Sequence, residues 1–355
     1  MILVADILGQ SSREHYASID PWNGKNVVVG TNNLEQLVQR ADLDGLVRHV
    51  DVTVAEKDWD HLVLIRNASR SAVDTGRQLW PIATLANVRL ALWAPAEYAV
   101  QSLDDHVRTF MPGPVSEILA VHHTWDELAP LLARGHDRSL YAYERALRGD
   151  SIDEDELGTL DIPIMPCDWE PRYAVATYTD MGGEFPAPPM PDRGDALNPA
   201  NDFVVLDDVD VQSAFRQLME PWTAQSNGRA SCVMTQGDAS HALSALGIID
   251  ADAEPLTTSS ALAWLAWAGA SGGAHGKRRG AASGRFGAWW TLAAISGMSE
   301  EWPLDQDEFG EILQQMNFWW WDSGEARTGW ELRLVIHDPE EQTSCALYAA
   351  DNEIE

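Results

Sequence analysis

The sequence predicts an α+β protein, in which an N-terminal array of helices precedes a domain with a small, mostly antiparallel sheet. Three observations predict this class: apolar residues recur at a helical period over residues 34–148, prolines crowd residues 150–202, and strands with alternating side chains close the chain. With 355 residues, the chain exceeds the size at which one core usually stops growing, about 250–300 residues. We therefore expect a mainly helical domain over 1–150, an ordered connection over 151–202 and an α+β domain over 203–355.

Start and stop signals mark the helices of the first domain. Residues 32–50 begin with an Asn cap, and their apolar residues follow a helical period, which predicts a helical stretch. Pro81 lies in the first turn of a later helix and Pro95 follows its end, the two places where a helix accepts proline. Thr124 and Glu127 form a capping box, because each side chain can satisfy an amide of the first turn. Short connections between these segments favour an antiparallel array.

The connection is rich in proline but also in aromatic residues. Eight of the chain's 18 prolines lie between Asp150 and Asp202, and such runs adopt an extended, polyproline-like backbone. A flexible linker has no use for large aromatic side chains, yet four lie among these prolines: Trp169, Tyr173, Tyr178 and Phe185. We therefore predict an ordered connection that lies along a surface.

The second domain ends in three predicted strands joined by short polar connections, a pattern typical of an antiparallel meander: residues 317–322, 329–338 and 344–351. In the middle strand, apolar residues alternate with Glu331, Arg333 and His337, which predicts a half-buried strand. The three consecutive tryptophans of "NFWWWD" must place at least one indole on each face of the sheet. The apolar segments 261–270 and 285–298 are predicted helices of the same domain, too short and interrupted to span a membrane.

The composition excludes several classes of protein. A formal net charge of −31 opposes binding to nucleic acids and to anionic membranes. The cysteines form no Cys-x-x-Cys pair, which argues against a disulfide framework and a structural zinc site: Cys167, Cys232 and Cys345. The first residues lack the basic start of a secretory signal, and no apolar run approaches the roughly 18 residues of a membrane span. We expect a cytoplasmic protein without a metal or a cofactor.

One segment departs from this acidity. Four of the 24 lysines and arginines lie between Ser271 and Phe286, interleaved with glycine, and we name this stretch the Arg/Gly segment. From Pro255 to Ser299 there is no Asp or Glu, where the chain average predicts about 7. Burial of the flanking apolar helices explains the missing acids but not the cations at the centre.

The Arg/Gly segment predicts a site for a phosphate or a carboxylate, because guanidinium groups match both anions bidentately. Its candidate residues are His275, Lys277, Arg278, Arg279 and Arg285. In the favoured interpretation, one helix carries a glycine row against another backbone and turns Arg278 and Arg285, about 20° apart, towards a cleft. That row consists of Gly272, Gly276, Gly280 and Gly284.

Two other interpretations of the Arg/Gly segment stay open. The glycines can form a loop whose amides, at the start of the next helix, bind the anion. Alternatively, the arginines pair with the protein's own acids and have a structural role. An anion site would let alanine replace Arg278 and Arg285 without unfolding the protein, whereas structural pairs would not.

Adjacent histidines, His122 and His123, precede the capping box. Neighbours in sequence point in different directions, so we do not expect them to share a metal ion.

Several stretches are similar to proteins of one family: residues 76–95, 124–132, 141–150, 221–239, 271–290 and 329–339. They resemble an uncharacterised actinobacterial family, a domain of unknown function, and the resemblance extends from Gly76 to Asp351. It implies a bacterial cytoplasmic protein and assigns no role to any residue. Lys277 stands where arginine is expected in such proteins, which leaves the charge unchanged.

Three functions follow and stay open. The first is a binding or accessory protein that recognises an anionic group at the Arg/Gly segment. The second is an enzyme that acts there on a phosphorylated or nucleotide-like substrate, with a strand-end aspartate as base: Asp322, Asp338 or Asp351. The third is an acidic decoy or partner of a basic, nucleic-acid-binding protein. An anionic small ligand or a protein partner is expected, and direct contact with nucleic acid or membrane is not.

Overall fold

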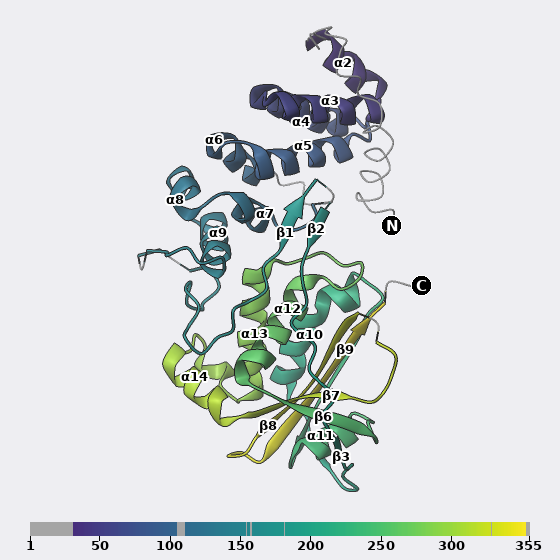
Figure 1. The fold of residues 1–355 in the computed structure, drawn as a ribbon, viewed down its shortest axis with the longest axis vertical. Coiled ribbons are helices and arrows are strands. Elements are labelled where there is room, and N and C mark those ends of the chain that lie inside the picture. Colours follow the sequence, from purple (N-terminus) through teal and green to yellow (C-terminus); the bar gives the residue numbers. More distant parts are fainter. Residues whose placement is uncertain are drawn as a thin grey trace. The chain divides into compact units, whose positions relative to one another are not determined.

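The computed structural model describes residues 31–104, 111–153, 155–156, 158–180, 182–327 and 329–352. It confirms the predicted α+β class, with helices first and an antiparallel sheet after them (Figure 1). The chain divides into two compact units. The helical unit holds the residues up to Arg138 together with Thr177–Glu184, and the sheet unit holds Ser139–Ala176 together with the residues from Phe185 onwards. The predicted domain boundaries at 150 and 202 stay predictions.

The helical unit consists of short helices and one small hairpin. Its elements are α2 (Thr31–Arg40), α3 (Leu43–Glu56), α4 (Trp59–Asp74), α5 (Trp80–Trp93), α6 (Ala96–Ala99), η1 (Val100–Asp104), α7 (Val115–His122), α8 (Trp125–Leu128), η2 (Ala129–Leu131), β1 (Thr177–Thr179) and β2 (Gly182–Glu184). α9 (His136–Leu147) begins with the last residues of the helical unit, up to Arg138, and continues into the sheet unit. Leucine, isoleucine and valine side chains from α2 to α5 form the core of this unit.

Capping residues decide where these helices begin. The predicted helical stretch over 32–50 is divided between α2 and α3, because the Asp42 carboxylate accepts the Gly45 N–H at 2.9 Å and starts a new helix there. The capping box is confirmed: the Glu127 carboxylate accepts the Thr124 N–H at 2.9 Å.

The sheet unit is built on an antiparallel sheet, to which seven strands contribute among the described residues, in the order β3-β6-β7-β8-β9-β5-β4. The strands are β3 (Asp195–Leu197), β4 (Val204–Leu206), β5 (Arg229–Gln236), β6 (Ala251–Leu256), β7 (Asn317–Asp322), β8 (Trp330–Asp338) and β9 (Thr343–Asp351). β7, β8 and β9 form the predicted meander, and the long β8–β9 pairing lies at the centre of the sheet.

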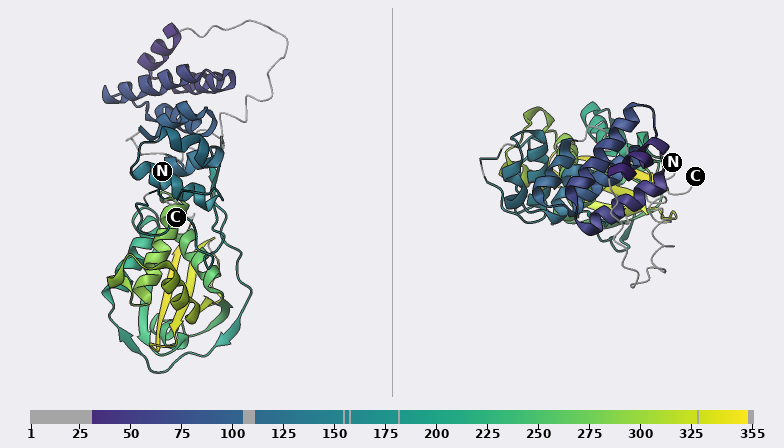
Figure 2. Two further views of the ribbon diagram at one scale, coloured as in Figure 1. Left: turned by 90° about the vertical axis from the view of Figure 1, so that its left-hand side faces the viewer. Right: turned by 90° about the horizontal axis from the view of Figure 1, so that it is seen from above.

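Helices cover both faces of this sheet. α10 (Val209–Ala224), α12 (Thr258–Ser271) and α13 (Ala281–Ile295) pack on one face, and α11 (Ala239–Ala245) packs on the other. In the left view of Figure 2 the green helices lie in front of the yellow strands. η3 (Ser299–Glu301) and α14 (Gln306–Gln315) follow α13. Trp320 belongs to the core under α12, whereas Trp319 and Trp321 belong to the core under α11, so the predicted division of the three indoles is confirmed.

β8 differs from the prediction. It is buried on both faces rather than half-buried, because it is a central strand with helices on each side. Arg333 is only 2% exposed and Glu331 only 4%. The Arg333 guanidinium lies 3.3 Å from both Glu331 and Asp322 and 5.5 Å from the Trp321 ring, so its charge is compensated inside the protein.

No helix in the part of the chain that the structure describes is long and apolar enough to cross a membrane.

Candidate functional site

The glycine row of the Arg/Gly segment does not lie on one helix. α12 ends at Gly272 (φ +85°), and α13 begins only after Gly280 (φ +89°). Between α12 and α13 the chain forms a loop. This agrees with the alternative interpretation of the Arg/Gly segment, in which its glycines form a loop before the next helix. Left-handed backbone is open to glycine without steric cost, so the glycines permit this turn.

Gly284 lies on a helix and keeps the predicted role of a close helix contact, whereas Gly276 lies in the loop, against the Pro221 carbonyl of α10. A Cβ atom added there would lie 2.2 Å from the Ala266 carbonyl oxygen of α12, and one added at Gly269 of α12 would lie 3.5 Å from the Gly284 Cα. Glycine therefore lets α12 and α13 approach each other closely. This contact brings the N-terminal part of α13 against the core of the sheet unit.

The loop amides bind acceptors that belong to the protein. The Ala274 N–H donates to the Asp351 carboxylate at 2.7 Å, and the His275 N–H donates to the Ser226 hydroxyl at 3.1 Å. Asp351, one of the strand-end aspartates, is only 1% exposed. The Asp351 carboxylate thus takes the place that a bound anion would have at Ala274.

Arg285 points into the interior. Its guanidinium donates to both carboxylate oxygens of Glu170, at 2.6 and 2.7 Å, and neither side chain is exposed. The guanidinium also donates to three backbone carbonyls, those of Pro163, Ile164 and Met165. Glu170 accepts further hydrogen bonds from the Trp289 indole and the Tyr173 hydroxyl. Burial would raise the pKa of Glu170, but the hydrogen bonds and charge of Arg285 hold that pKa below its ordinary value.

The other cations of the Arg/Gly segment lie nearer the surface. Arg279 donates to the Glu220 carboxylate and to the Gln217 carbonyl. The Arg278 guanidinium lies 4.0 Å from the centre of the Phe185 ring, in cation–π geometry. Lys277 is exposed and His275 is half-buried.

The five candidate residues of the predicted anion site therefore do not form one cluster. Arg279 and Arg285 contact acids of the protein itself, as the structural interpretation expects. Arg285 is buried while Lys277 is exposed, so these two do not share one solvent-facing cluster. Anion binding by His275, Lys277 and Arg278 stays a prediction.

The loop geometry gives a prediction for Gly280. Its φ of +89° and ψ of +159° belong to a region that only glycine adopts readily, so Gly280→Ala should destabilise the protein by about 1–3 kcal/mol. Chemical denaturation measures this loss. A Gly280→Ala protein that is more stable than the parent would contradict this loop conformation, since alanine stabilises only a position whose φ and ψ it adopts without strain.

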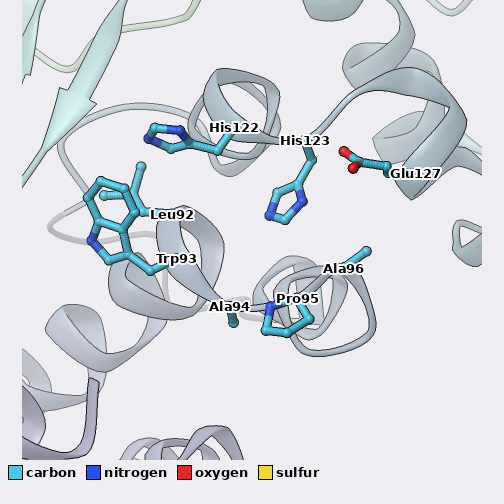
Figure 3. A pocket seen from close by; sticks show the side chains of 8 residues that line it. All are labelled: Leu92, Trp93, Ala94, Pro95, Ala96, His122, His123 and Glu127. Carbon is cyan, nitrogen blue, oxygen red and sulfur yellow. The ribbon is translucent and has the colours of Figure 1, made fainter. Parts of the chain in front are cut away.

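A second candidate site lies in the helical unit, where the chain forms a hollow of about 390 Å³. It is lined by Leu92, Trp93, Ala94, Pro95, Ala96, His122, His123 and Glu127 (Figure 3). The end of α5 and the start of α6 provide the apolar wall, and the end of α7 and the start of α8 provide the polar one.

The polar side chains of the hollow have distinct environments. The His122 ring lies 4.7 Å from the Trp93 indole, centre to centre, and partial burial lowers the pKa of His122. The Trp93 N–H donates to Asp180 at 3.0 Å, which fixes the plane of the indole. His123 lies between Trp93 and Glu127 in Figure 3 and is only 8% exposed.

Sequence reasoning did not assign this hollow. It considered His122 and His123 only as metal ligands, and the described residues contain no group of three or more side chains that could hold a metal ion. The available signal was the pair of histidines directly before a capping box, because the cap holds the start of α8 beside them.

The chain matches a known protein family, but not a curated protein or a solved structure. No curated protein matches the chain, and no solved structure matches it. One family model matches residues 44–353, which is most of the chain and includes both candidate sites. Its description confirms the resemblance to an uncharacterised family and does not bear on the organism. The chain therefore belongs to the family of unknown function DUF6183.

Proposed function

We propose that this protein is a binding protein whose helical unit holds a small organic cation with a flat apolar group. The observation that carries the proposal is the arrangement across the hollow in Figure 3: an indole, Trp93, on one side and a carboxylate, Glu127, on the other. An aromatic face and a carboxylate are both groups that attract an ammonium ion.

The size and lining of the hollow support a small ligand. Its volume of about 390 Å³ is within the range of ligand pockets, roughly 300–1,000 Å³. Apolar side chains from Leu92 to Ala96 form one wall, and a few polar groups face them. Polar groups held at fixed positions in such a lining fix the orientation of a ligand.

Electrostatics favour a cation over an anion. Desolvation lowers the pKa of His122, which disfavours a positive charge on this imidazole and so reduces its repulsion of a positive ligand. The Glu127 carboxylate lines the hollow while it accepts the Thr124 N–H at the start of α8. The net charge of −31 also raises the concentration of cations around the protein.

The experiment is a calorimetric titration with tryptamine, compared with indole-3-propionate as the matching anion. Tryptamine should bind, and Glu127→Gln should weaken its binding about tenfold, the loss expected for one charge-assisted hydrogen bond. Glutamine can still serve in the capping box, so the fold should be unchanged. Trp93→Leu should weaken binding about two- to fivefold through the lost cation–π contact.

Asp126→Asn is the matched control. Asp126 is adjacent to Glu127, is exposed and does not line the hollow, yet its substitution changes the net charge equally. It should leave the affinity for tryptamine within about twofold. Equal affinity for both indoles, or equal losses in Glu127→Gln and Asp126→Asn, would contradict the proposal.

The functions predicted at the Arg/Gly segment, whether as binding protein or as enzyme, stay predictions, as do the decoy function and the cytoplasmic location. The double variant Arg278→Ala, Arg285→Ala no longer separates them cleanly, because Arg285 contacts Glu170 in the interior.

A further inference from the structure

One end of the sheet presents a short edge strand with exposed apolar side chains. β4 is the last strand in the order, and within the described residues it pairs only with β5. Alternate N–H and C=O groups of an edge strand point away from its neighbour and are open to hydrogen bonding. Proteins often guard such an edge with lysine or proline, and the stretch from Phe203 to Leu206 contains neither.

The side chains along this edge are apolar and exposed. Phe203 is 44% exposed, Val204 62% and Val205 53%. Val204 lies opposite Gln236 and Val205 opposite Thr235, so the two valines lie on opposite faces of the sheet. An added strand would therefore find apolar contacts on both faces as well as backbone partners.

Acidic residues surround this apolar stretch. Asp202 precedes it, and Asp207, Asp208 and Asp210 follow it. If a second copy paired with β4 so that Val204 faced Val205, Asp202 would lie opposite Asp207. Like charges directly opposite each other destabilise a strand pair, so the acids disfavour self-association. The same acids attract a strand with positive flanks.

We propose that the outer edge of β4 binds an extended segment of a partner protein, one that carries alternating apolar residues with lysine or arginine on both sides. The segment adds to the sheet as a further strand, so that backbone hydrogen bonds provide affinity and the flanking charges provide specificity. This surface belongs to the sheet unit, and the proposal does not depend on the hollow in the helical unit.

The test uses two synthetic peptides, Lys-Lys-Val-Thr-Val-Thr-Val-Lys-Lys and the same peptide with glutamate in place of every lysine. In calorimetric titrations of the full chain at about 50 mM salt, where charge pairs are weakly screened, the lysine peptide should bind at least about tenfold more tightly. In the variant Asp202→Lys, Asp207→Lys this preference should reverse. Hydrogen exchange of the Val204–Leu206 amides of the unaltered protein should slow at least about tenfold when the lysine peptide is bound.

The matched control is Glu340→Lys, Glu341→Lys, in the exposed turn between β8 and β9, which changes the net charge equally. It should keep the preference for the lysine peptide. The proposal is overturned if the unaltered protein binds neither peptide, if the control reverses the preference too, or if bound peptide leaves β4 exchange unchanged. A dimer that protects β4 without peptide would assign the edge to a second copy instead.

Discussion

Arg285→Ala should lower the free energy of unfolding by about 3–5 kcal/mol, as measured by denaturant titration followed through tryptophan fluorescence. The guanidinium and the Glu170 carboxylate are both fully buried and lie 2.6 Å apart. Alanine would leave the Glu170 carboxylate without its countercharge in the interior, and would free three backbone carbonyls that Arg285 now satisfies. The loss is large because a buried charge has no water to replace its partner.

Two comparisons make this prediction specific. Arg279→Ala removes a pair of which Glu220 is 55% exposed, so it should cost no more than about 1 kcal/mol. The double variant Arg285→Met, Glu170→Leu removes both charges together and should recover the part of the loss that comes from the unpaired charge, since apolar groups of similar volume often replace buried pairs without cost. If Arg285→Ala unfolds at the same denaturant concentration as the parent, the buried pair does not stabilise the fold and the prediction is wrong.

Gly284→Ala should be the second most damaging of these changes, at about 1–3 kcal/mol or more. The added Cβ would lie 2.2 Å from the Ala266 carbonyl oxygen and 2.6 Å from the Ala270 Cβ, and neither can move without moving α12. Alanine is the better helix former by up to about 1 kcal/mol, but that gain cannot offset a clash with backbone. Thermal unfolding and denaturant titration both measure the effect.

Gly287→Ala, one turn later in α13, is the matched control. There the added Cβ would meet only the end of the Leu218 side chain, at 2.8 Å, and such a chain end can move aside. The gain in helix propensity should then cancel the contact, so the free energy of unfolding should change by less than about 1 kcal/mol. Equal losses at Gly284 and Gly287 would show that α12 and α13 do not pack at Gly284.

The sequence by itself determined the features that depend on neighbours along the chain. The capping box of Thr124 and Glu127 joins residues three positions apart, and the meander of β7, β8 and β9 depends on short connections and on alternation within each strand. The composition also indicated the Arg/Gly segment as a place where cations lie among buried helices. These signals come from residues that are close in sequence, so they can be recognised without knowledge of the fold.

Only the tertiary structure decided which face each charged residue presents. Arg278 and Arg285 look alike in sequence, yet Arg285 is buried because Glu170, 115 positions away, lies beside it. Arg333 is inside because β8 is a central strand, a fact that depends on which strands flank it. The segment that carries the glycine row forms a loop, in which Asp351 and Ser226 accept the Ala274 and His275 amides. A charged group is stable in the interior only beside its partner, and the partner's position is a property of the fold.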